Sequence, residues 1–196
     1  NISAPSDYNG FDISCFGSSD GAIDVSVNGG VLPYNFLWST ADTTEDLSGI
    51  GIGNYLVVIT DSNSCTRSLP ITLTGPTALT IIGVVENVLC NGYSNGSIDI
   101  TPSGGVATYI YNWSNSASTE DIINLGPGNY NVTVTDQNGC TITYTGLVNE
   151  LSSLVINTTA ANPLCFGFNN GSIDVTMQGG MGPFNYTWSN GSSNED

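Results

Sequence analysis

The residues best equipped for chemistry in this sequence are its five cysteines. None of them lies in a Cys-x-x-Cys motif or another zinc-binding spacing, so their pattern predicts disulfides and not ligation of a metal by thiolates. Disulfides persist in the oxidising surroundings outside cells, which indicates an extracellular, cell-surface location. The odd number predicts that one partner lies outside the sequence. The candidate disulfide residues are Cys15, Cys65, Cys90, Cys140 and Cys165.

Two acidic turns contain candidate calcium ligands. Asp61 and Asn63 in the first turn, and Asp136 and Asn138 in the second, place oxygen atoms two residues apart, as calcium-binding loops do. Neither turn has the full spacing of an EF-hand loop. The alternative interpretation is that Asp, Asn and Gly simply form turns here. Calcium is therefore the one cofactor that the sequence suggests, and both interpretations stay open.

Basic side chains are almost absent. The chain has no His, no Lys and one Arg, Arg67, against 17 acidic residues, which gives a formal net charge of −16. Without His or Lys the sequence lacks Ser-His and Cys-His pairs, imidazole metal ligands and Schiff-base lysines, so we predict that it is not an enzyme. Only paired carboxylates of the glycosidase type are formally available.

The same charge excludes two classes of partner. Binding to nucleic acids and binding to anionic membrane surfaces both require Lys and Arg side chains, so we expect neither kind of partner. No stretch of the sequence approaches the roughly 18 apolar residues of a membrane helix, and we expect no direct membrane insertion. The partners that stay open are neighbouring repeats of the same chain, other copies in a filament, and surface glycans or substrata.

The cysteines and several other motifs belong to an internal sequence repeat. Cys15, Cys90 and Cys165 follow one another at a constant spacing, and Gly-Gly pairs, tryptophans and Glu-Asp pairs recur with the same step. The sequence therefore predicts units at 1–75, 76–150 and 151–196, the last of them incomplete.

Within a unit the hydrophobic residues alternate with a period of two, as in half-buried strands. The clearest runs are 23–27, 34–38 and 55–59, with flanking strands predicted at 79–88 and 141–148. No segment has a sustained helical stripe. About six or seven short strands per unit, with frequent turns, indicate a β-sandwich. The predicted fold is all-β: tandem Ig-like β-sandwich repeats, each as long as the unit 1–75, stacked as a rod.

Recurring positions in the repeat carry aromatic side chains, which we interpret as core residues. A tryptophan follows the Gly-Gly turn where strand C of an Ig sandwich carries its core Trp, and a Gly-Asn-Tyr triplet opens a later strand as a tyrosine corner does. The alternative is a glycan-stacking platform, which requires these rings on the solvent face. The residues are Trp38, Trp113, Trp188, Tyr55 and Tyr130.

The disulfide connectivity has two alternatives. Pairing within units joins Cys15 to Cys65 and Cys90 to Cys140. In an Ig-like topology Cys15 precedes one strand and Cys65 follows another strand that runs in the same direction, so the two cysteines lie a strand length, roughly 20 Å, apart. The Cα atoms of a disulfide lie within about 7 Å of each other. In a head-to-tail rod the end that carries Cys15 meets the next unit's turn, so an inter-repeat pair Cys15–Cys140 is the other alternative. Both stay open.

The order of motifs resembles a known family. From Cys90 the sequence reads Cys-Asn-Gly-x-x-Asn-Gly-Ser-Ile-Asp-Ile-Thr, then Ser-Gly-Gly, then Tyr-x-Tyr-Asn-Trp-Ser and Thr-Glu-Asp-Ile. It ends with Leu-Gly-Pro-Gly-Asn-Tyr-Asn-Val-Thr-Val-Thr-Asp-Gln-Asn-Gly-Cys at Cys140. This run is similar to the SprB repeat of giant surface adhesins of Bacteroidota. The resemblance implies a secreted, type IX-exported surface filament that serves adhesion and, in some members, gliding motility. It carries over no catalytic residues.

Overall fold

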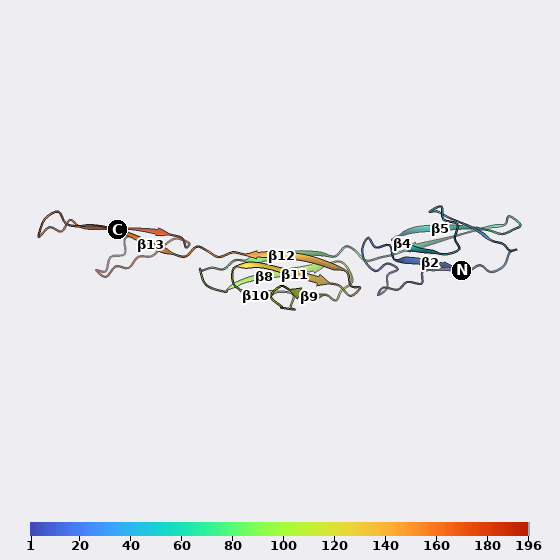
Figure 1. Cartoon of the computed structure of the whole chain (residues 1–196), viewed down its shortest axis with the longest axis horizontal. Coiled ribbons are helices and arrows are strands. Elements are labelled where there is room, and N and C mark those ends of the chain that lie inside the picture. The colour runs from blue at the N-terminus through green and yellow to red at the C-terminus, as the bar shows by residue number, and fades with distance from the viewer. Residues whose placement is uncertain (196) are drawn as a thin grey trace. The chain divides into compact units, whose positions relative to one another are not determined.

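The computed structural model describes residues 1–195, and over these residues the chain is all-β, without helices. Asp196, the last residue of the predicted third unit, lies outside the described residues. No helix long and apolar enough to cross a membrane occurs among them. The strands, several of them labelled in Figure 1, are β1 (Ile2–Ser3), β2 (Gly21–Val25), β3 (Asn35–Trp38), β4 (Leu47–Ile50), β5 (Gly53–Thr60), β6 (Thr66–Leu73), β7 (Thr80–Glu86), β8 (Gly96–Ser103), β9 (Ile110–Trp113), β10 (Ile122–Leu125), β11 (Gly128–Thr135), β12 (Thr141–Val148), β13 (Val155–Ala161) and β14 (Ser172–Gln178).

The first repeat, residues 1–75, forms a six-stranded sandwich. One sheet has the order β1-β2-β4 and the other β3-β5-β6, with antiparallel pairing throughout. In Ig terms these are the A-B-E and C-F-G sheets, with no strand D among residues 1–75. The longest ladder joins β5 to β6 over eight residue pairs, from Gly53↔Leu73 to Thr60↔Thr66. The prediction of an Ig-like β-sandwich is confirmed.

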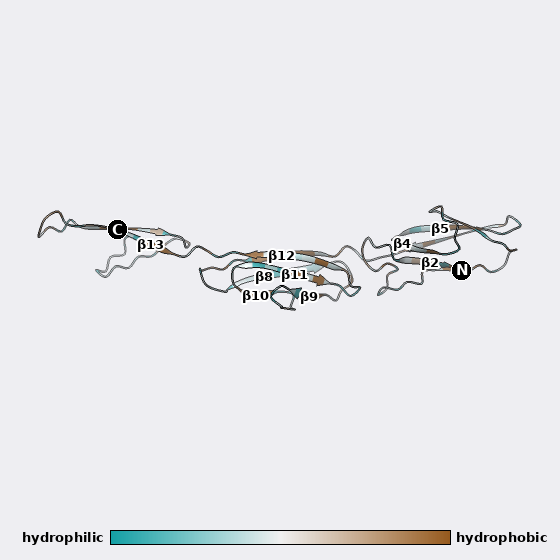
Figure 2. Ribbon diagram, viewed as in Figure 1, coloured by the Kyte–Doolittle hydropathy of each residue, from teal (hydrophilic) through white to brown (hydrophobic). Residues whose placement is uncertain are grey.

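Alternation along the strands builds the core of this sandwich. In β5 the side chains of Val57 and Ile59 are 0 % and 7 % exposed, while Leu56, next to Val57, is exposed. Figure 2 shows that the strands carry both hydrophobic and hydrophilic residues. Burying such side chains supplies most of the driving force for folding. The core cluster consists of Ile13, Ile23, Val25, Trp38, Leu47, Val57, Ile59 and Leu73.

The second repeat, residues 76–150, reproduces the core of this sandwich position by position, although its first strand, β7, is longer than β1. Its sheets have the orders β10-β8-β7 and β12-β11-β9. Each core position of the first repeat has an equivalent in the second that is again a buried hydrophobic residue, so the two repeats share one folding pattern. These residues are Val88, Ile98, Ile100, Trp113, Ile122, Val132, Val134 and Val148.

One short strand in each repeat was absent from the sequence prediction. β4 and β10 each contain a residue in the left-handed conformation, Gly49 with φ 69° and Asn124 with φ 58°. The pairing registers shift at this place, between Gly21 and Ala22 opposite β4 and between Ile123 and Leu125 in β10. A bulge interrupts the period of two, which explains why the pattern did not reveal these strands.

Residues 151–195 form a smaller element. β13 and β14 pair antiparallel over seven residue pairs, from Val155↔Gln178 to Ala161↔Ser172. Among the described residues of this segment, Val175 is the buried hydrophobic side chain, 6 % exposed. A two-stranded hairpin of this kind is marginally stable by itself.

The chain divides into two compact units whose boundaries differ from those of the sequence repeats. The acidic turn near Cys140 belongs to the same unit as the first repeat, because it bonds to a loop of that repeat, as described below. The first unit comprises Asn1–Ile82, Ile100–Glu120 and Asn131–Tyr144, and the second Gly83–Asp99, Asp121–Tyr130 and Thr145–Asp196.

The core assignment predicts different costs for two substitutions of similar size in the first repeat. Ile23 is 1 % exposed and Leu37 is 54 % exposed. We expect Ile23→Ala to lower the free energy of unfolding by about 2–5 kcal/mol through lost burial and a cavity. Leu37→Ala should cost less than about 1 kcal/mol. Urea unfolding followed by tryptophan fluorescence measures both, and equal costs would contradict the assignment.

Candidate functional site

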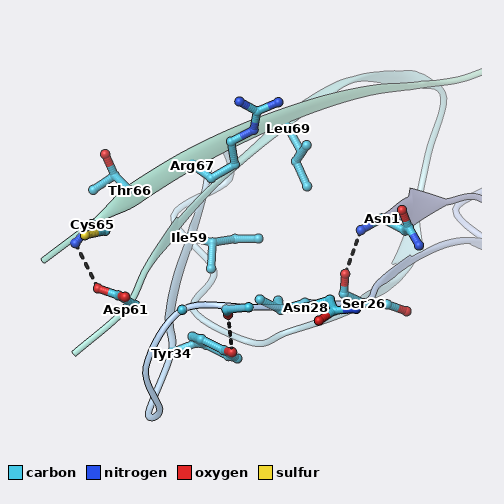
Figure 3. A pocket seen from close by; sticks show the side chains of 13 residues that line it. Asn1, Ser26, Asn28, Tyr34, Ile59, Asp61, Cys65, Thr66, Arg67 and Leu69 are labelled. Carbon is cyan, nitrogen blue, oxygen red and sulfur yellow. Dashed lines mark hydrogen bonds between the residues drawn. The ribbon is translucent and has the colours of Figure 1, made fainter. Parts of the chain in front are cut away.

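Each complete repeat has a polar site built on an acidic turn. We define the acidic turn as residues 61–65 in the first repeat and residues 136–140 in the second. In the first repeat, Asp61 Oδ1 accepts hydrogen bonds from the backbone N–H groups of Asn63 and Cys65, both at 2.9 Å. Its Oδ2 accepts one from Val31 N at 3.1 Å. Figure 3 shows Asp61 and Cys65 facing each other across this turn. One carboxylate thus fixes the whole turn.

The second repeat has the same arrangement around Asp136, which is 3 % exposed. Its Oδ1 accepts from the N–H groups of Asn138 and Cys140 at 2.9 Å, and its Oδ2 accepts from Val106 N at 2.9 Å. Gly105 allows this close approach, because it has φ 59° and a Cβ there would lie 2.5 Å from Asp136 Oδ2. The recurring Gly-Gly pair therefore serves the acidic turn.

The geometry accounts for the Asp-x-Asn spacing without a metal ion. The backbone N–H of Cys65, with those of Val31 and Asn63, lowers the pKa of Asp61 below its ordinary value of 3.8, although desolvation raises it in part. Both carboxylate oxygens are occupied by backbone amides. Among the described residues no group of three or more His, Cys, Asp or Glu side chains is placed to hold a metal ion. The turn interpretation thus explains Asp61, Asn63, Asp136 and Asn138, and nothing in this region favours calcium.

The second half of the site is a cysteine loop, which we define as residues 12–20. Asp12 holds its start, since its Oδ2 accepts from the N–H and the hydroxyl of Thr74 at 2.7 and 2.9 Å. Ser14 N donates to Asp20 Oδ1 at 3.2 Å across the loop, and Ser18 N donates to Cys15 O at 3.0 Å. The side-chain hydrogen bond with Ser14 lowers the pKa of Asp20. The loop therefore presents Cys15 on a fixed backbone.

A disulfide joins the two halves across the repeat boundary. Cys15 of the first repeat is bonded to Cys140 of the second, with a Cα–Cα distance of 5.8 Å and a sequence separation of 125 residues. Of the two alternatives, the structure thus contains the inter-repeat pair, which excludes Cys15–Cys65 and Cys90–Cys140. Cys65, Cys90 and Cys165 are free and exposed.

The amide of Asn138 clamps the same junction. Its Nδ2 donates to Ser14 O at 2.8 Å and to Tyr8 O at 3.2 Å, while its Oδ1 accepts from Asn9 Nδ2 at 2.5 Å. Gln137 Nε2 adds a bond to Asn9 Oδ1 at 3.3 Å. The sequence had suggested Asn138 as a calcium ligand or as a turn residue, and not as a contact to another repeat. Its position two residues before a cysteine in both acidic turns was the signal for this role, but the acceptor carbonyls lie 124 and 130 residues away along the chain.

In the two complete repeats the predicted core aromatics are buried or partly buried. Trp38 and Trp113 are each 2 % exposed, and Trp188 is half-buried. The indole N–H of each donates to the carbonyl of the residue six positions later, at 2.8–2.9 Å. Tyr55 and Tyr130 are partly buried and donate their hydroxyls to the carbonyl four positions earlier, at 2.8 and 3.1 Å. The last contact is that of a tyrosine corner.

Comparison with known proteins identifies the family of these repeats. A model described as the SprB repeat matches residues 11–43, 82–118 and 157–193, together more than half of the chain. The chain belongs to the SprB repeat family, as its motif order predicted. No curated protein matches the chain. SprB repeats occur in secreted surface proteins, so the family indicates an adhesin-like repeat region outside the cell.

The clamp predicts that two equivalent asparagines differ in their effect on the disulfide. Asn138→Ala removes the bonds to Ser14 and Tyr8, and we expect dithiothreitol to reduce Cys15–Cys140 about tenfold faster, as for the loss of one to two net hydrogen bonds. Asn63 is the equivalent residue in the acidic turn 61–65, whose Cys65 is free. Asn63→Ala should therefore leave the rate of Cys15–Cys140 reduction unchanged. Thiol labelling with mass spectrometry measures the rates; equal rates for all three proteins would contradict the clamp.

The lowered pKa of Asp61 predicts how acid affects the first acidic turn. A carboxyl whose folded-state pKa is depressed stabilises the fold above its unfolded value, and this contribution is lost as pH falls through the folded value. The turn should therefore persist at pH 3.8 and open only below it. An NMR titration should give a common midpoint below 3.8 for the Asp61 carboxyl carbon and the Cys65 amide, and Asp61→Asn should abolish the amide's transition. A midpoint at or above 3.8 would refute this.

Proposed function

We propose that this chain is a structural and adhesive repeat region, a shaft that carries tension, of a large extracellular surface adhesin or filament. The observation that carries the proposal is the junction in which Cys140 and Asn138 of one repeat hold the cysteine loop of the preceding one. A covalent link at the joint between repeats is useful to a protein that transmits force and has little value for catalysis. Membership of the SprB repeat family supports the same role.

The finer features of the proposal follow the family. We infer type IX export, anchoring at the surface of a bacterium of the Bacteroidota, and service in adhesion or gliding motility. Neighbouring repeats are the first partners of each repeat. The absence of His and Lys from the sequence supports a non-enzymatic role.

The glycan-binding alternative has less support. A sugar platform requires exposed aromatic faces, whereas Trp38 and Trp113 are buried. A hollow in the first repeat includes Tyr34 and Arg67 in its lining, as Figure 3 shows, but the hydroxyl of Tyr34 is bonded to Gly29 O. A glycan array probed with the whole chain tests this alternative, and specific binding there would favour it over the shaft.

Mechanical extension tests the shaft directly. When the chain is pulled from its two ends, the Cys15–Cys140 bond should carry the load and shield the residues between them. In single-molecule force spectroscopy, reduction should lengthen the fully unfolded chain by roughly 400–450 Å, the extended length of the 125 residues that the bond spans. Cys140→Ser should show the longer extension without reductant. An oxidised chain that extends to its full length would overturn the proposal.

A further inference from the structure

The dipeptide Asn-Gly recurs along this chain and is open to deamidation. Glycine has no side chain to shield its backbone nitrogen, so this nitrogen can attack the side-chain amide of the preceding asparagine and convert it to a carboxylate. The pairs begin at Asn9, Asn28, Asn91, Asn95, Asn138, Asn170 and Asn190. One of them, Asn138–Gly139, lies in the acidic turn that joins the second repeat to the first.

The closed joint between the repeats holds the side-chain amide of Asn138 on all sides. Its Nδ2, the atom that deamidation expels, donates to Ser14 O at 2.8 Å and to Tyr8 O at 3.2 Å. Its Oδ1 accepts from Asn9 Nδ2 at 2.5 Å. The attacking atom, Gly139 N, is itself bonded within the turn. The amide of Asn138 cannot turn toward this nitrogen until its bonds to the first repeat break, so the closed joint protects it.

The acidic turn of the first repeat differs at the same place. Its asparagine, Asn63, is followed by Ser64, whose side chain hinders attack by the backbone nitrogen. Its cysteine, Cys65, is free among the described residues. Of the two acidic turns, 136–140 is therefore the one that combines the reactive dipeptide with bonds to another repeat.

We propose that Asn138 is a deamidation site that the closed joint protects, and that deamidation of an opened joint prevents it from closing again. An aspartate at this position has no N–H to donate, and its negative charge would face the carbonyl oxygens of Ser14 and Tyr8. An isoaspartate would also lengthen the backbone of the turn by one carbon atom. The modification thus makes opening of the joint irreversible. The inference goes beyond the shaft proposed above, since it holds whatever the repeats attach to.

The reaction consumes only water. Gly139 N attacks the side-chain carbonyl carbon, Cγ, of Asn138, and the bond from Cγ to Nδ2 breaks. The amide nitrogen leaves as ammonia and takes the proton of the Gly139 N–H. Water then opens the resulting succinimide ring at either of its two carbonyl carbons, which gives aspartate or isoaspartate. One asparagine and one water molecule thus give one acidic residue and one molecule of ammonia.

The test compares the whole chain with its Cys15→Ser variant, which removes the disulfide and leaves the residues around Asn138 unchanged. Both proteins are incubated at neutral pH without oxidant, digested with chymotrypsin and analysed by mass spectrometry at each Asn-Gly pair. We expect Asn138 to deamidate at least about tenfold faster in Cys15→Ser, because an open joint forgoes one to two net hydrogen bonds to the amide. Asn28, exposed beside Gly29, should react at the same rate in both proteins.

A second pair of variants tests whether the product blocks the joint. Asn138→Asp has the side chain of the deamidated residue, and after reduction and transfer to a glutathione redox buffer it should re-form Cys15–Cys140 at least about tenfold more slowly than the unmodified chain. Asn63→Asp, the matched change in the turn 61–65, should re-form it at the normal rate.

Three results would overturn the proposal. The first is that Asn138 reacts as fast as Asn28 in the chain with its disulfide intact. The second is that Asn138 reacts equally slowly in that chain and in Cys15→Ser. The third is that Asn138→Asp re-forms the disulfide as fast as the unmodified chain.

Discussion

The junction depends on one buried carboxylate. Asp136 accepts three backbone hydrogen bonds, and these place the amide of Asn138 and the sulfur of Cys140 on one side of a rigid turn. Hydrogen bonds to a charged group contribute about 1.5–3 kcal/mol each, whereas a buried carboxylate without them would be strongly unfavourable. The turn therefore has a single stable conformation. The disulfide and the amide clamp that join the first repeat to the second depend on that conformation.

The sandwich supplies the frame that this turn needs. In each complete repeat the acidic turn joins the two longest paired strands, β5 to β6 and β11 to β12. Each repeat is short enough to have only a modest core, so it gains stability from added links. In the chain-entropy model, a disulfide that closes a loop as long as that between Cys15 and Cys140 contributes about 4–5 kcal/mol. The link between repeats thus adds stability and fixes the joint.

Sequence periodicity predicted the repeat, the sheets and the buried tryptophans well, because burial alternates along β2, β3 and β5. It missed β4, since Gly49 breaks the alternation with a bulge. Asn138 was interpreted as a candidate calcium ligand or a turn residue, and its contact with another repeat was missed. Its partners are carbonyls in another repeat, and local patterns hold no information about contacts over such separations. The choice between the two disulfide pairings stayed open for the same reason.

Arg67 provides the most direct measurement, because the sequence has no other tryptic site. After alkylation of free thiols and denaturation, trypsin divides the chain between Arg67 and Ser68, with Cys15 in one fragment and Cys140 in the other. We predict that fragments 1–67 and 68–196 stay joined until a reductant is added, and that the joining peptide contains Cys15 and Cys140. Fragments that separate without reductant, each with an internal disulfide, would contradict the central claim that successive repeats are covalently locked.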